Sequence, residues 1–168
     1  MTTFRVGTAI QGRDAADAVA QIRQAEAAGV EAAWATIGGA GGDDPIAAYA
    51  AALVQTSQIL LGTAIIQTWP RHPVLIAQQT LALDALAPGR FRLGIGPAHE
   101  GNMERTYGVD FKAPLTNLRE YLTIITALLH TGEVDFIGKQ VTARTRLRTT
   151  TDTPVMGSAL RPRSFELC

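Results

Sequence analysis

The chain has 168 residues, of which 46% are hydrophobic and 18% charged, a composition typical of a globular domain and not of a disordered segment. Fifteen basic residues balance fifteen acidic ones, so no net charge favours binding to nucleic acid or to an anionic membrane. Because Cys168 is the only cysteine and no secretory signal opens the sequence, we expect a cytoplasmic protein without a disulfide or a cysteine-bound metal.

Strands and helices are predicted to alternate along the chain. Asp14 is a candidate cap for the first helix, Gly29 is placed to end it, and Asp44-Pro45 is typical of the start of the second. We predict strands at residues 4–10, 32–37, 59–66, 91–96 and 153–159. We predict helices that begin near 14, 45, 73 and 117, loops at 38–44 and 97–114, and a hairpin at 134–144 with its turn at Gly138-Lys139.

The first four predicted strands begin at residues 4, 32, 59 and 91, so they are spaced 28, 27 and 32 residues apart. They are nearly continuous apolar runs, as expected for parallel strands that helices cover. A strand–helix repeat of this period indicates parallel β/α architecture. The repeat alone leaves two architectures open, a doubly wound sheet and a closed (β/α)8 barrel.

In both architectures ligands bind at the carboxyl ends of the strands. The corner after the third strand is rich in polar and bulky residues (Gln67, Thr68, Trp69, Arg71, His72), and the corner after the fourth contains His99 and Glu100. His72 is best interpreted as a helix cap, whereas His99 is either a solvated loop residue or a functional one. The glycines at 38–42 match neither a P-loop nor a GxGxxG fingerprint.

The sequence contains no GxSxG elbow and no cluster of His, Asp and Glu at metal-ligand spacing. We therefore expect no metal site, and a cofactor that brings its own chemistry suits so sparse a site. Gly94-Ile95-Gly96 has two interpretations, room for a flat group at the strand end or simple packing within the sheet.

The segment 61–99, LGTAIIQTWPRHPVLIAQQTLALDALAPGRFRLGIGPAH, closely resembles the luciferase-like flavin and deazaflavin (coenzyme F420) oxidoreductases. The stretches NLREYLTIITALLHTGEVDFIGK and TPVMGSALRPR also look like this family's helix–hairpin insertion and its fifth strand. The resemblance implies a (β/α)8 TIM-barrel fold, here limited to about the first five strands with the helix–hairpin insertion before the fifth.

The resemblance also implies a set of site residues around a flavin or deazaflavin ring. A non-proline cis peptide at Ala64-Ile65 would support the ring, Thr68 and His99 would line the cofactor, and Gly96 would clear space for it. Ser158, Ala159 and Leu160 would approach its phosphate side, and Arg161-Pro162 would open the next helix. His99 is the one residue nominated for catalysis, as a proton-transfer group.

The expected cofactor is coenzyme F420, with FMN as the alternative. Deazaflavin members of the family often carry an acidic residue directly after the second strand, where this chain has Ile37-Gly38-Gly39, with Asp43 and Asp44 coming later. The expected reaction is hydride transfer with a small-molecule substrate, or oxygen-dependent monooxygenation in the FMN case.

A barrel of this type needs about 250 residues. We therefore interpret 1–168 as a partial barrel domain, with 164–168 as a tail outside the family pattern that replaces the next helix. A truncated enzyme with weak or absent activity, a half-barrel completed by dimerisation, and a non-catalytic remnant or interaction protein are the alternatives. Exposed strand edges predict a homo-oligomer.

Overall fold

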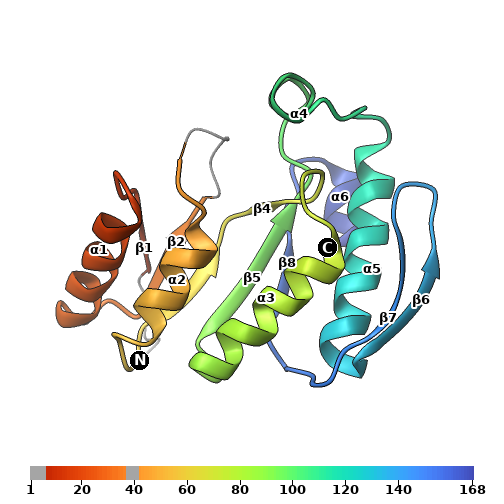
Figure 1. The fold of residues 1–168 in the computed structure, drawn as a ribbon. Coiled ribbons are helices and arrows are strands. Elements are labelled where there is room, and N and C mark those ends of the chain that lie inside the picture. Colours follow the sequence, from red (N-terminus) through yellow and green to blue (C-terminus); the bar gives the residue numbers. More distant parts are fainter. Residues whose placement is uncertain (1–6, 37–41) are drawn as a thin grey trace.

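The computed structural model describes residues 7–36 and 42–168, which form one parallel sheet, a layer of helices and a separate hairpin (Figure 1). The strands are β1 (Gly7–Ala9), β2 (Ala32–Ala35), β3 (Leu60–Thr63), β4 (Ile66–Gln67), β5 (Phe91–Gly96), β6 (Glu133–Ile137), β7 (Thr142–Arg146) and β8 (Val155–Gly157). The helices are α1 (Ala15–Ala27), α2 (Pro45–Leu53), α3 (Pro73–Leu86), α4 (Glu100–Tyr107), α5 (Pro114–Thr131) and α6 (Pro162–Leu167).

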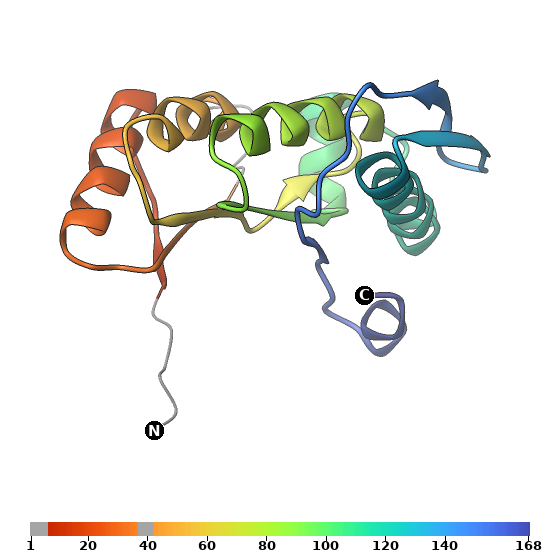
Figure 2. The same cartoon turned by 90° about the horizontal axis from the view of Figure 1, so that it is seen from below.

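The sheet has the strand order expected for successive β/α units of a barrel. β1, β2, β3 and β5 pair in turn, all parallel, and β8 pairs with the other side of β5. β4 pairs with the carboxyl half of β5, through Ile66 opposite Ile95, so β3 and β4 are the two halves of one interrupted strand. Figure 2 shows that α1, α2 and α3 all lie on one face of this sheet.

The predicted starts of the first three helices are confirmed, and at each a polar side chain accepts an N–H group that the first helical turn leaves free. Asp14 accepts from the amide of Asp17 at 2.8 Å, and Asp44 accepts from that of Ile46 at 2.9 Å. His72 caps α3 as predicted, with Nδ1 accepting from the amide of Val74 at 3.3 Å.

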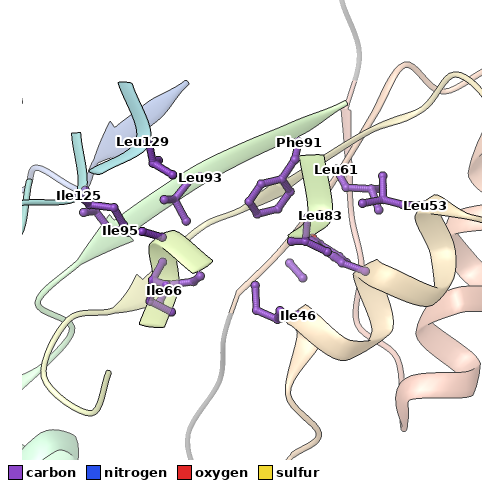
Figure 3. Close-up of a cluster of buried hydrophobic side chains, with 14 of the residues drawn as sticks. Ile46, Leu53, Leu61, Ile66, Leu83, Phe91, Leu93, Ile95, Ile125 and Leu129 are labelled. Carbon is purple, nitrogen blue, oxygen red and sulfur yellow. The ribbon is translucent and has the colours of Figure 1, made fainter. Parts of the chain in front are cut away.

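The core lies between the sheet and its helices. Alternate residues of β5 (Phe91, Leu93 and Ile95) point to this side and are fully buried, with Leu53 of α2 and Leu83 of α3 among their neighbours in the cluster (Figure 3). The buried Tyr49 of α2 meets Phe91 edge-on, at 6.2 Å between ring centroids, and donates a hydrogen bond to the carbonyl of Gly62 at 2.7 Å. This packing fixes the helix layer against the central strands.

Three predicted boundaries need correction. The predicted loop 97–114 contains α4, which the sequence hides because Met103 is its one buried residue and no apolar stripe repeats. The predicted third strand is broken after Thr63, since Ala64 and Ile65 belong to neither β3 nor β4. Residues 164–167, expected to replace a helix, continue α6 after Pro162. The predicted first strand is described only from Gly7 onward.

The hairpin β6–β7 packs along α5 and is tied to it at the hairpin turn. Glu120 of α5 is buried, and its carboxylate accepts the backbone N–H groups of Lys139, Gln140 and Val141 at 2.8, 2.8 and 2.9 Å. The turn thus lies as predicted at Gly138-Lys139, and the insertion forms one unit with the helix.

Candidate functional site

A cleft of about 1130 Å³ opens at the carboxyl ends of the strands. Its floor comes from the β3–β4 connection, and its walls come from residues 97–100, the start of α5 and the segment between β8 and α6. α4 lies above the end of β5 at this side of the sheet (Figure 1). The lining residues are Thr36, Ala64, Ile65, Gln67, Pro97, Ala98, His99, Glu100, Phe111, Pro114, Leu115, Leu118, Ser158, Leu160, Arg161, Pro162, Arg163 and Ser164.

The floor of the cleft is the bulge that separates β3 from β4. The peptide bond between Ala64 and Ile65 is cis, as the family resemblance implied, and both residues line the cleft. Thr63 fixes the bulge to β5, because its hydroxyl donates to the carbonyl of Gly94 and accepts from the amide of Gly94, both at 2.8 Å. A side chain at Gly94 would begin 2.0 Å from the carbonyl oxygen of Thr63, so the two strands approach closely only because residue 94 is glycine.

Three of the predicted cofactor residues do not line the cleft: Thr68, Gly96 and Ala159. Thr68 is 3% exposed, and its hydroxyl donates to Oδ1 of the buried Asn117 at 2.6 Å, which ties the end of β4 to α5. Gly96 is buried, and a Cβ there would lie 2.7 Å from Cβ of Ser158 and 3.3 Å from Ile65. The glycine therefore lets the bulge and the β8 loop converge, and its role toward the cofactor stays a prediction.

His99 and Glu100 lie on the cleft wall at the start of α4. The main-chain carbonyl of His99 accepts from the amides of Asn102 and Met103, both at 3.1 Å, but its side chain makes no capping hydrogen bond. The exposed imidazole is thus available to a molecule in the cleft. Ala98 before it has φ +60°, a left-handed conformation that is unusual for a residue with a side chain.

The segment after β8 forms the polar wall. Ser158 and Leu160 line the cleft as predicted, whereas Ala159 lies between them without contributing to the lining. Arg161 caps α6 in a reciprocal arrangement in which its amide donates to Oγ of Ser164 at 3.0 Å. Both Arg161 and Arg163 are exposed and reach the cleft, so this wall carries positive charge.

Sequence reasoning missed the contribution of α5 and of the residues before it. Phe111, Pro114, Leu115 and Leu118 line the cleft, but the helix was predicted to begin only at residue 117. The signal was present, since Pro114 is the first residue of α5 and proline is favoured there. The acidic residues after the second strand have other partners: Asp43 accepts from the amide of Ala15, and Asp44 pairs with Arg71, both at 2.7 Å.

Residues 7–36 and 42–168 contain neither a metal-binding cluster nor a membrane-spanning helix. No group of three or more His, Cys, Asp or Glu side chains is arranged to hold a metal ion. None of the helices in the same ranges is both long enough and apolar enough to cross a membrane. Residues 37–41 of the glycine-rich loop lie outside the described residues. They include the position directly after the second strand, where deazaflavin members often carry an acidic residue.

Comparison with known proteins identifies the family and the fold of this chain. The family model described as luciferase-like monooxygenase matches residues 1–168. The chain belongs to this family. The luciferase-like chain superimposes on the coenzyme F420-dependent tetrahydromethanopterin reductase of Methanopyrus kandleri with a TM-score of 0.84 and 25% identity, over 99% of this chain and 53% of that one.

Two further relatives are similar to this chain. An F420-dependent secondary alcohol dehydrogenase, solved with an F420–acetone adduct, matches at 22% identity with a TM-score of 0.85, over 99% of this chain and 55% of that one. The F420-dependent glucose-6-phosphate dehydrogenase of Beutenbergia cavernae is 36% identical over 98 residues, which is 56% of this chain and 29% of that protein. The luciferase-like chain spans about half the length of the solved proteins, and its parallel sheet corresponds to about half of their TIM barrel.

Proposed function

We propose that the cleft at the carboxyl ends of β4, β5 and β8 binds the ring of coenzyme F420 and serves hydride transfer with a small-molecule substrate. The observation that carries this proposal is the cleft itself, which both the Ala64–Ile65 bulge and Ser158 line. When bound, F420 supplies the chemistry, by taking up or releasing a hydride at the ring carbon that corresponds to N5 of a flavin.

The residues present fit such a group. The cleft volume of about 1130 Å³ is near the upper end of ordinary ligand sites, which suits a cofactor and a substrate together. Ala64 and Ile65 bring apolar side chains and backbone to the lining of the cleft, where they would contact the ring. Arg161 and Arg163 face the cleft where an anionic part of the cofactor would be stabilised.

FMN is the alternative cofactor for the same cleft. Asp43 and Asp44 are engaged with α1 and with Arg71, so neither supplies the acidic group that many deazaflavin members place after the second strand. The names of several relatives favour F420, among them the F420-dependent glucose-6-phosphate dehydrogenase.

His99 is proposed as the proton-transfer residue, because its imidazole lies on the cleft wall and is not used in capping α4. An imidazole accepts a proton in its neutral form and donates one in its protonated form, which is what a substrate hydroxyl or carbonyl oxygen requires when a hydride leaves or arrives at its carbon.

The test is an equilibrium titration of the purified chain with F420 and, separately, FMN, followed by cofactor fluorescence. We expect saturable binding of F420 and weaker binding of FMN. His99→Ala should leave the F420 dissociation constant within about threefold and slow reduction of bound F420 by an alcohol about ten- to a hundredfold. A folded sample that binds neither cofactor would instead support the non-catalytic alternative.

A further inference from the structure

One wall of the cleft consists of apolar side chains from a single stretch of chain. Phe111, Pro114, Leu115 and Leu118, hereafter the apolar wall, all line the cleft. Leu115 and Leu118 are three residues apart in α5 and so share a helix face, and Leu118 is 1% exposed. The charged lining residues belong to other segments, Glu100 to the start of α4, and Arg161 and Arg163 to the β8–α6 segment.

Residues that follow β4 hold the apolar wall in place. The ring of Trp69 packs on that of Phe111, with centroids 5.1 Å apart and planes inclined by 38°. Thr68, next to it, is hydrogen-bonded to Asn117 in the first turn of α5 at 2.6 Å. The wall is thereby fixed to the same strand end as the floor of the cleft, so it is formed before any ligand binds.

We propose that the apolar wall binds the hydrocarbon part of an uncharged alcohol or carbonyl substrate; this inference rests on the proposed function, which supplies the redox chemistry. A charged group placed against these four side chains would lose its hydration without gaining a partner, which is strongly unfavourable. A hydrocarbon chain gains free energy there with each methylene group that leaves water. The polar end of such a substrate would then face Gln67 and His99, which also line the cleft.

The test uses the full chain without cofactor, titrated with 1-butanol, 1-hexanol and 1-octanol and followed by tryptophan fluorescence and calorimetry. Each added methylene should tighten binding about three- to fourfold. Leu115→Asn, which keeps the side-chain size but adds polarity, should remove most of this dependence on chain length.

Leu75→Asn is the matched control. Leu75 also lies in the first turn of a helix that begins with proline, it is 48% exposed, and it does not line the cleft. The inference is overturned if affinity does not rise with chain length, or if Leu75→Asn weakens binding as much as Leu115→Asn.

An F420 titration of the same samples separates this inference from the proposed function. Binding of F420 without length-dependent binding of alkanols overturns the inference about the apolar wall and leaves the proposed function in place. Length-dependent binding through Leu115 without binding of F420 overturns the proposed function and supports the assigned ligand class.

Discussion

Glu120 is a carboxylate that the fold buries and compensates within the helix–hairpin insertion. Burial by itself raises the pKa of this carboxyl, but the three backbone N–H donors of Lys139, Gln140 and Val141 outweigh burial and hold the pKa below its usual value of 4.5. Glu26 of α1 does the same for the chain before β3, where it accepts from the amides of Ser57, Gln58 and Ile59 at 2.9, 2.7 and 3.0 Å. In both places one carboxylate accepts the backbone N–H groups of a connecting segment that would otherwise have no partner.

Glu120→Gln should lower the free energy of unfolding by about 1.5–3 kcal/mol at pH 7, because an amide cannot accept all three bonds with a charged group's strength. Since the folded-state pKa is lowered, this contribution is complete above pH 4.5 and is lost as the pH falls through the folded-state value. Urea unfolding at pH 7 and at pH 3 measures it, with Glu104→Gln on the exposed face of α4 as control. Equal losses for both variants at pH 7 would contradict the assignment.

At the scale of elements, the junction of β3, β4 and β5 depends on a glycine. Gly94→Ala would place a Cβ 2.0 Å from the backbone oxygen of Thr63, which a side-chain rotation cannot relieve, so we expect a loss of about 1–3 kcal/mol or more. Gly101→Ala in α4 meets nothing within 4 Å and should be neutral or slightly stabilising. Urea unfolding measures the free energy of unfolding of both variants. A Gly94→Ala protein as stable as the parent would show that the two strands can separate at no cost.

The sequence predicts those elements whose signals are local. The caps at Asp14, Asp44 and His72 and the nearly continuous apolar run of β5 follow from neighbouring residues, and the structure confirms them. The break after Thr63 was implied by family resemblance alone, because it results from contact with Gly94, 31 residues away. α4 escaped prediction because Met103 is its single buried residue. The orientation of Thr68 toward Asn117 depends on α5, 49 residues later, which no local pattern encodes.

At the scale of the whole molecule, one edge of the sheet is open: β8 is an outer strand, and its outer side has no strand neighbour in the described residues. β8 pairs with β5 on one side, and no other strand pairing involves it in the described parts of the chain. Large exposed apolar side chains lie in β8 and in the residues that follow it, with Met156 37%, Leu160 80% and Phe165 67% exposed. A free edge next to exposed apolar surface favours association between chains.

We therefore expect the chain to self-associate with rising concentration in sedimentation velocity. The double change Met156→Lys with Phe165→Lys should shift it toward monomer, because lysine at a strand edge opposes pairing with another chain. Val54→Lys with Ile137→Lys is the matched control, since these side chains are 61% and 68% exposed but belong to the end of α2 and to the hairpin. If the control variant disperses the assemblies and the β8 variant does not, the contact between chains lies elsewhere. A parent chain that stays monomeric at all concentrations would show that this edge is protected in solution.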